Sequence, residues 1–228
     1  MAHPRVGVIL AGCGVFDGAE IHEAVITLLA LDRAGAHVVC MAPDVKQLHV
    51  INHLTGEATD EARNVLVESA RIARGRIRDI ATIDPAELDA LIIPGGFGAA
   101  KNLCDFAIKG TACTVHPEVA RVIRGVHVAG KPVGAACIAP AILAKLLGSE
   151  QPRLTIGTDS ATASALESLG ARHTTCGPDA TVVDREHHLV TTPAYMVAGW
   201  IAEAAVGIER LVAEVLEMAA VPQATGAR

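Results

Sequence analysis

Residues 5–42 read RVGVILAGCGVFDGAEIHEAVITLLALDRAGAHVVCMA, and this stretch decides the fold class. The apolar, β-branched run Arg5–Ala11 ends at glycines and predicts a buried strand. Apolar residues at helical spacing over Glu20–Ala34 predict a helix that stops at Gly35, and Ala36–Ala42 predicts a second strand. A strand, a helix and a strand in so short a span favour a right-handed crossover between two parallel strands.

The rest of the chain continues this alternation of strands and helices. Further strands are expected at Leu88–Pro94, Pro132–Ala136, Leu154–Gly157, Thr181–Asp184 and Val190–Thr192. Further helices are expected at Asp60–Arg74, Pro117–Ala129, Ile138–Leu147, Ala161–Leu169 and Met196–Ala220, the last as one helix or two. Phe97–His116 shows no clear period, which predicts a loop or short helices. We therefore expect one doubly wound α/β domain over residues 1–228, with a mostly parallel sheet between layers of helices.

Composition and charge narrow the classes of partner. Hydrophobic residues make up 51% of the chain and aromatic residues only 2%, so the core is expected to consist of Ala, Val, Ile and Leu. The net charge is −6, and no run of Lys or Arg could follow a phosphate backbone. Nucleic acid is therefore not expected as a partner.

The sequence also bears on membranes, metals and redox compartment. No apolar run reaches the roughly 18 residues needed to span a bilayer, and Met1–Arg5 leads into a strand without the pattern of a signal peptide. The six cysteines contain no CxxC pair, which disfavours a zinc site or a disulfide framework. We expect no membrane segment, no metal, no cofactor and a cytoplasmic, reducing location with free thiols.

Of the six cysteines, Cys137 is the one whose neighbouring sequence suggests a chemical role. Residues 132–147, PVGAACIAPAILAKLL, run from a strand through small residues and Cys137 into a helix, which is the layout of a nucleophile elbow. The amide groups and the dipole at the start of that helix are expected to lower the pKa of the thiol, and the amide of Ile138 could serve as an oxyanion donor. The alternative is that Cys137 is a small buried apolar residue, as free cysteines usually are.

Two other turns follow strands at the same edge of the expected sheet. Gly95 and Gly96 end the strand at Leu88–Pro94, and the amide of Gly96 is a candidate oxyanion donor, although a plain tight turn explains Pro-Gly-Gly equally well.

The turn after the first strand carries acidic residues and the rival thiol Cys13. Acidic residues there mostly reflect helix-start preference, but one carboxyl group buried beside a thiol could stay neutral and exchange protons. His22 and Glu23 have no third ligand at metal spacing.

Several longer motifs carry a family resemblance. VILAGCGVFDGAEIHEAV, INHLTGEA, IIPGGFGAAKNL, GAACIAPAIL, LTIGTD and VTTPAYM extend from about Val8 to beyond Tyr195. In these motifs the chain resembles the ElbB-like glyoxalases, a branch of the ThiJ/PfpI superfamily. The resemblance implies a flavodoxin-like, class I glutamine amidotransferase-like fold, a homodimer, and cofactor-independent conversion of glyoxal to glycolate. It also implies a link to isoprenoid metabolism.

The resemblance carries roles onto particular residues. The elbow cysteine falls on Cys137, the protonated glutamate beside the thiol on Glu23, and the oxyanion glycine on Gly96. Ile138 stands where protease-like members have a histidine, which disfavours peptidase and glutaminase activity. His116 could reach the pocket from the loop before the elbow, although a histidine before the helix-starting Pro117 has a plainer capping role.

The leading hypothesis is a glyoxalase in which the Cys137 thiolate forms a hemithioacetal with a small dicarbonyl substrate. Its oxyanion would face the amides of Gly96 and Ile138, and the candidate bases for the proton shift are Glu23, then His116, then His22. The alternatives are a redox-sensing or aldehyde-scavenging cysteine without significant turnover, and a hydrolase or amidotransferase. Apolar helix faces over Val197–Val215 could form a dimer interface or belong to the core.

Overall fold

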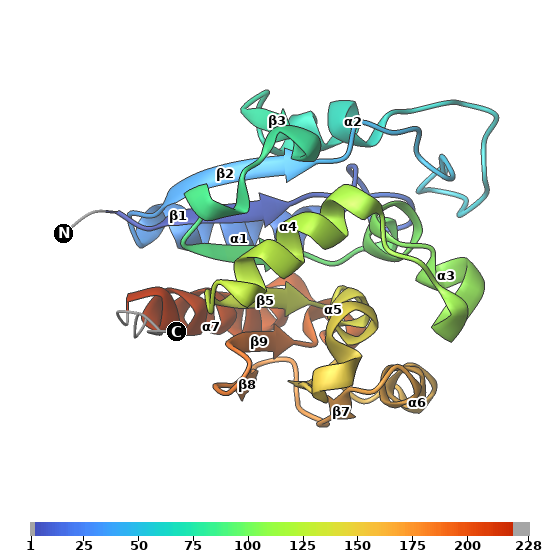
Figure 1. The fold of residues 1–228 in the computed structure, drawn as a ribbon. Helices are drawn as coiled ribbons and strands as arrows, with labels where there is room; N and C mark the ends of the chain where they lie inside the picture. The colour runs from blue at the N-terminus through green and yellow to red at the C-terminus, as the bar shows by residue number, and fades with distance from the viewer. Residues whose placement is uncertain (1–2, 221–228) are drawn as a thin grey trace.

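The protein was studied as a computed structural model, which describes residues 3–220 (Figure 1). Its main feature is a seven-stranded sheet with the order β3-β2-β1-β4-β5-β9-β8. The strands are β1 (Arg5–Ile9), β2 (His37–Ala42), β3 (Ile77–Asp79), β4 (Ala90–Ile93), β5 (Val133–Ala136), β8 (Val182–Asp184) and β9 (Leu189–Thr192). All neighbouring pairs are parallel except β8 and β9, which are antiparallel. The prediction of a mostly parallel α/β sheet is confirmed.

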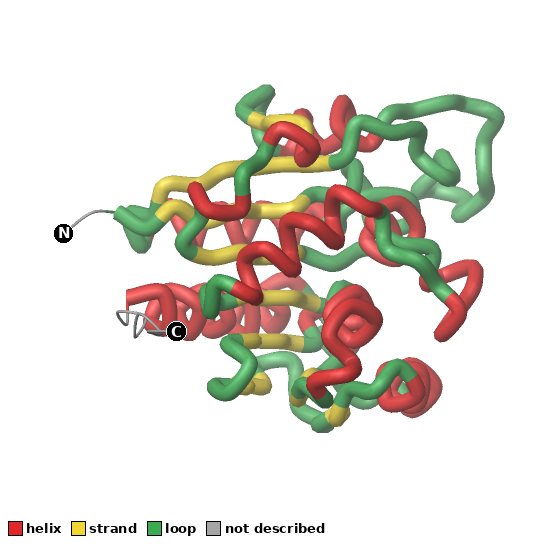
Figure 2. Tube along the Cα trace, viewed as in Figure 1, coloured by secondary structure: helices red, strands yellow, loops and turns green. Residues whose placement is uncertain are grey.

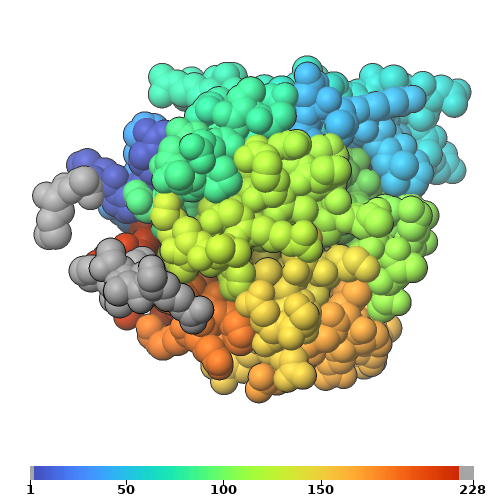
Figure 3. All heavy atoms as spheres, viewed as in Figure 1, coloured from blue at the N-terminus to red at the C-terminus, as the bar shows by residue number. Residues whose placement is uncertain are grey.

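Helices cover both faces of this sheet. They are α1 (Ile21–Arg33), α2 (Val65–Ile72), α3 (Phe106–Lys109), α4 (Pro117–Val128), α5 (Pro140–Leu147), α6 (Ser160–Ser168) and α7 (Ile201–Ala220). Helices α4 and α5 lie in front of the sheet in the view of Figure 1, and α1 and α7 lie behind it. Figure 3 shows that α4 and α5, in green and yellow, cover the centre of the front face. No helix within residues 3–220 combines the length and apolar content needed to cross a membrane.

The hydrophobic core lies between the sheet and these helices, and the expected strands supply many of its residues. All four residues of β4 are buried, and Val6, Val8 and Ile9 of β1 are fully buried. Strands buried on both faces need continuous apolar sequence, which is why these runs could be recognised. The helix predicted at Glu20–Ala34 begins at Ile21, because the Glu20 side chain caps it by accepting from the Glu23 amide.

The segment between β2 and α2 was predicted in part wrongly. The helix expected at Asp60–Arg74 covers only Val65–Ile72, because the Asn64 side chain accepts a hydrogen bond from the Val67 amide at 3.0 Å and caps it there. Residues 46–62 instead form a long, exposed loop, which Figure 2 draws in green at the upper right. Strand β3 was not predicted, since it is a three-residue edge strand whose sequence, Ile-Arg-Asp, has no apolar run.

The sequence after α5 also departs from the prediction. Only Leu154 of the expected strand Leu154–Gly157 is in a strand, β6 (Arg153–Leu154), which pairs with β7 (Arg172–His173) in a separate two-stranded sheet. The Thr155 amide donates to the Thr191 hydroxyl at 2.9 Å instead of joining a ladder. The helix expected from Met196 begins at Ile201, after a 3-10 turn.

The order of the strands identifies the edge at which a ligand would bind. From β1 the chain adds β2 and β3 on one side, and β4 and β5 on the other. This reversal lies between β1 and β4, and in open α/β sheets ligands bind beside such a point, at the carboxyl ends of the strands. Short helices fill the segment after β4, as predicted for Phe97–His116: a π-helical turn η3 (Ala99–Leu103), α3 and a 3-10 turn (Gly110–Ala112).

Candidate functional site

Cys137 directly follows β5 at the carboxyl edge of the sheet. Its backbone has φ = +59°, in the left-handed region that residues with a side chain rarely occupy. Its amide donates to the Thr192 carbonyl at 3.0 Å, which ties the turn to the end of β9. Helix α5 begins at Pro140 rather than Ile138, so Cys137 lies on a strained turn between strand and helix. The side chain is 8% exposed.

Glu23 lies beside Cys137, although it comes from the first turn of α1. Its side chain is fully buried and hydrogen-bonded to the Cys137 thiol. One carboxylate oxygen accepts the Gly95 amide at 2.8 Å, and the other accepts the Tyr195 amide at 3.2 Å. Burial, and to a smaller extent the nearby Glu20 carboxylate, raise the pKa of Glu23 to about 7. A carboxyl group held in this way can carry a proton near neutral pH.

Burial also raises the pKa of the Cys137 thiol well above its ordinary value, and the Glu23 charge acts in the same direction. The prediction that the helix start would lower the thiol pKa is therefore wrong in its net direction. The amides of Gly96 and Ile138 do donate to the sulfur and lower its pKa, but burial has the larger effect. Because a negative charge on either group disfavours one on the other, a thiolate at Cys137 is less disfavoured when Glu23 carries the proton.

Gly95 and Gly96 fit the site because they lack a side chain. A Cβ at Gly95 would lie 2.3 Å from the Cys137 Cβ and 2.7 Å from a Glu23 carboxylate oxygen. Gly96 has φ = +92°, and a Cβ there would lie 2.3 Å from the Glu20 amide nitrogen. The Glu20 amide in turn donates to the Gly95 carbonyl at 3.0 Å. These close approaches hold the turn after β4 against the start of α1.

The two histidines proposed as bases have other partners. The Nδ1 atom of His22 lies 2.8 Å from the Tyr195 hydroxyl on the exposed side of α1. The His116 ring accepts a hydrogen bond from the Glu118 amide at 3.3 Å and caps α4. The structure brings Cys137, Glu23 and the amides of Gly96 and Ile138 together, whereas the His22 ring lies at the Tyr195 hydroxyl and the His116 ring at the Glu118 amide.

Sequence reasoning missed Tyr195 as a residue of this site. Its amide binds Glu23 and its hydroxyl reaches His22, so it touches α1 twice. The preceding Ala194 has φ = +42°, which turns the chain sharply after β9. The sequence signal that could have identified Tyr195 was its position: Pro193-Ala194-Tyr195 directly follows an expected strand that could pair with β5, at whose end Cys137 lies.

The other cysteines have no comparable setting. Cys13, the rival thiol, is half-buried, and burial together with the Glu68 charge raises its pKa. All six cysteines are free thiols. Residues 3–220 contain no cluster of three potential metal ligands.

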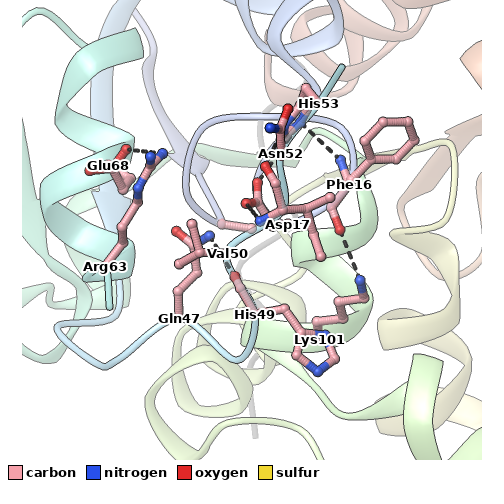
Figure 4. Close-up of polar contacts among 12 residues, drawn as sticks. Phe16, Asp17, Gln47, His49, Val50, Asn52, His53, Arg63, Glu68 and Lys101 are labelled. Carbon is pink, nitrogen blue, oxygen red and sulfur yellow. Dashed lines mark hydrogen bonds and ion pairs between the residues drawn. The ribbon is translucent and has the colours of Figure 1, made fainter. Parts of the chain in front are cut away.

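A polar cluster joins the loop after β1 to the loop of residues 46–62 (Figure 4). Asp17 is 2% exposed, and its carboxylate accepts the Ile51 amide at 2.7 Å. The Phe16 amide donates to the His53 ring at 3.3 Å, and the Phe16 carbonyl accepts from the Lys101 ammonium at 2.8 Å. The cluster thus fixes the conformation of the loop that leads into the first turn of α1.

Comparison with known proteins gives a consistent result. A family model described as DJ-1/PfpI family matches residues 11–194. The chain is 48% identical, over 94% of its length and 83% of the relative, to the human "Glutamine amidotransferase-like class 1 domain-containing protein 3, mitochondrial". It is 47% identical, over 94% of its length and 84% of the relative, to the rat "ES1 protein homolog, mitochondrial".

A solved structure agrees over nearly the whole chain. The crystal structure of an isoprenoid biosynthesis protein with an amidotransferase-like domain from Ehrlichia chaffeensis superposes with a TM-score of 0.87 at 37% identity. The match covers 93% of this chain and 99% of that one. The resemblance to the ThiJ/PfpI superfamily and the flavodoxin-like, class I glutamine amidotransferase-like fold are therefore confirmed.

The expectation of a cytoplasmic location is wrong, because the human and rat relatives are both named as mitochondrial proteins. The expectation rested on free thiols, on the lack of a signal-peptide pattern at Met1–Arg5 and on the lack of a membrane-spanning run, and free thiols separate only reducing from oxidising compartments. Cysteine usage does not distinguish one reducing compartment from another.

Proposed function

Because the chain belongs to the DJ-1/PfpI family, we propose that it is a cofactor-independent glyoxalase that converts glyoxal to glycolate with Cys137 as nucleophile. The observation that carries this proposal is the position of Glu23. Its buried carboxyl group bonds to the Cys137 thiol and to two backbone amides, and its pKa of about 7 suits proton exchange at neutral pH.

In the first step, the Cys137 thiolate adds to one aldehyde carbon of glyoxal. A sulfur–carbon bond forms, and the carbonyl electron pair moves to oxygen. The amides of Gly96 and Ile138, which face the sulfur, also suit an oxyanion on the carbon bonded to it. The proton held by Glu23 passes to this oxygen and gives a hemithioacetal.

In the second step, the Glu23 carboxylate removes the proton from the hemithioacetal carbon and returns it to the neighbouring carbon, while the hydroxyl proton on the first carbon passes to the oxygen of the second. The product is a thioester of glycolate, and water releases glycolate and the free thiol. One carbon is oxidised and the other is reduced, so the reaction consumes only water. Glu23 is the preferred base because the rings of His22 and His116 bond to Tyr195 and to the Glu118 amide.

The two alternatives are less well supported. Redox-sensing cysteines are exposed and have low pKa values, whereas Cys137 is 8% exposed and its pKa is raised. A hydrolase or amidotransferase of the protease-like type would use a histidine directly after the nucleophile, where this chain has Ile138. The name of the Ehrlichia protein supports a link to isoprenoid metabolism, which we propose for this chain as well.

We also propose a homodimer formed through α1 and the start of α7. Three apolar residues spaced one helical turn apart on α1, Ile21, Val25 and Leu29, are 43%, 47% and 42% exposed. Trp200 and Ile201 add further exposed apolar surface at the start of α7, which packs against α1. Exposed apolar side chains grouped on one helix face are typical of a protein interface. Of the helix faces considered over Val197–Val215, the side that includes Ile208, Leu211 and Val215 is buried in the core.

The test of the proposed reaction is glycolate formation from glyoxal by Cys137→Ala and Cys137→Ser. Both variants are expected to lose at least about a hundredfold in kcat/KM, because neither side chain supplies a thiolate. Cys176→Ala is the matched control, since this half-buried thiol bonds to Thr155 outside the site. Undiminished glycolate formation by both Cys137 variants would exclude the proposal.

A further inference from the structure

A cavity of about 270 Å³ lies between the two-stranded sheet and the turn that joins β8 to β9. Its lining includes Asp184–His187 of that turn, Arg153 of β6 and Arg172 of β7. Figure 1 shows β7 and β8 at the bottom of the view, near β9. The turn precedes β9, whereas Cys137 follows the parallel neighbour β5, so the turn and the thiol lie at opposite ends of these strands.

Two arginines stand side by side in this cavity. Arg153 and Arg172 are register partners in the parallel pair of β6 and β7, and both line the cavity. Like charges at such neighbouring positions repel each other. Within residues 3–220, neither guanidinium forms an ion pair with a carboxylate. An anion bound between them would relieve the repulsion.

Most of the hydrogen-bond donors on these two side chains are available to a ligand. A guanidinium has five N–H donors, and Arg153 uses its Nη2 to donate to the Val183 carbonyl at 2.7 Å. The Arg172 side chain makes no hydrogen bond within the part of the chain that the structure describes. The buried Asp184 carboxylate has other partners: it accepts the Arg153 amide at 2.7 Å and lies 2.9 Å from the His187 Nδ1 atom.

Arg185 adds a third guanidinium to the lining of the cavity. Its side chain is 66% exposed, and its Nη2 atom lies 3.8 Å from carboxylate oxygens of Glu214 and Glu217 on α7. These separations are longer than hydrogen bonds, so the pairing is weak. The lining thus holds three arginines against two carboxylates, those of Asp184 and Glu186.

We propose that this cavity binds the phosphate group of a small molecule, with Arg153 and Arg172 as its main contacts. A guanidinium is always charged, and its planar pair of donors matches two phosphate oxygens. Two neighbouring guanidiniums balance a phosphate dianion, whereas one would balance a carboxylate. The volume lies near the lower end of the range for ligand pockets, about 300 Å³, and so suits a small ligand. The inference is independent of the proposed function, because no residue used in that reaction lines the cavity.

Isothermal titration calorimetry with inorganic phosphate and with glycerol 3-phosphate, at neutral pH and constant ionic strength, tests this site. Arg172→Met should weaken the binding of both about fivefold, because it removes one cation that contacts the phosphate. Arg153→Met with Arg172→Met should weaken it further. Tighter binding of glycerol 3-phosphate than of inorganic phosphate would support a phosphate ester as the ligand, and equal affinities would support free phosphate.

Arg124→Met is the matched control, because it removes the same charge from an exposed arginine on α4 that does not line the cavity. It should leave both affinities unchanged. Arg172→Lys should keep part of the affinity, since it retains the charge without the planar pair of donors. Circular dichroism checks that each variant is folded. If the double variant does not fold, Arg172→Met alone decides, because its side chain has no hydrogen-bond partner within residues 3–220.

Three results would overturn the proposal. One is the absence of binding of either phosphate compound at up to roughly 10 mM. Another is an affinity for phosphate in Arg172→Met equal to that of the wild type. The third is acetate that binds as tightly as phosphate, because the cavity would then not select a dianion.

Discussion

Glu23 shows how a single residue acquires its properties from residues distant in sequence. A glutamate in the first turn of a helix is normally exposed and ionised. Here the Gly95 amide, the Tyr195 amide and the Cys137 thiol surround its carboxyl group, and burial raises its pKa to about 7. The raised pKa of this carboxyl group is therefore a property of the folded chain.

This pKa predicts a pH dependence of stability. Between the ordinary pKa of 4.5 and about 7, the folded protein keeps a proton that the unfolded chain releases. The stability contributed by Glu23 is thus fully present below pH 4.5 and declines, by roughly 3 kcal/mol, as the pH rises to about 7. Glu23→Gln should remove this decline, as measured by urea unfolding at several pH values.

The control is Glu57→Gln, which changes an exposed glutamate in the loop of residues 46–62. It should keep the wild-type dependence on pH. Glutamine offers one acceptor oxygen where the carboxylate offers two, so Glu23→Gln also changes the free energy of unfolding at every pH. The test therefore compares how this free energy changes with pH and not its absolute value. A wild-type slope in Glu23→Gln would contradict the buried, protonated carboxyl group.

Sequence alone could identify part of this site. Cys137 was predictable because small residues, a strand and a helix start surround it locally. The resemblance supplied Glu23 and Gly96. Tyr195 could not be found in this way, because its contact with Glu23 spans 172 residues and uses only its backbone amide. The direction of the thiol pKa was missed because burial depends on the packed fold.

At the scale of elements, the turn after β4 holds three parts of the structure together. Gly95 and Gly96 contact the start of α1, the elbow after β5 and the loop after β1. The turn was recognisable as Pro-Gly-Gly, but its packing was not. Strand β3 was missed, and the helix expected from Asp60 begins only at Val65, for a related reason: edge and loop segments have no apolar period.

The crowding of this turn predicts that alanine destabilises the protein more at Gly96 than at Gly75, although both glycines have a positive φ. Gly75 has φ = +78° and open space around its missing Cβ, so Gly75→Ala should cost only the backbone strain, about 1 kcal/mol. Gly96→Ala adds a Cβ 2.3 Å from the Glu20 amide nitrogen, so it should destabilise the protein by at least about 2 kcal/mol more. Urea unfolding of both variants measures the difference. Equal losses would show that the turn can relax.

At the scale of the whole molecule, the fold class followed from the first strand, helix and strand. Buried parallel strands need continuous apolar runs, and their crossover is right-handed, which leaves few arrangements. The strand order β3-β2-β1-β4-β5-β9-β8 was not predictable, because strand pairing depends on contacts between distant segments. The exposed stripe on α1 was also not distinguishable from core in the sequence.

The three exposed apolar residues on α1, Ile21, Val25 and Leu29, predict the oligomeric state. Val25→Glu with Leu29→Glu introduces two charges into the proposed interface and should convert a dimer into a monomer in sedimentation velocity experiments. Val67→Glu is the control, because Val67 is 60% exposed on α2 and is not among the residues of the proposed interface. Val67→Glu should leave the dimer intact. A dimer that persists in the double variant would exclude α1 as the interface.

The hydrogen bonds around Glu23 also bear on how the chain folds. They join residues separated by 72 and 172 positions, so a large part of the chain must be ordered before they close. Closing long segments costs entropy before the contacts contribute, and pairings of this kind are slow to form. During refolding, helices should therefore appear before Cys137 becomes distinct in reactivity. Until the last strands join the sheet, it is one of six ordinary thiols.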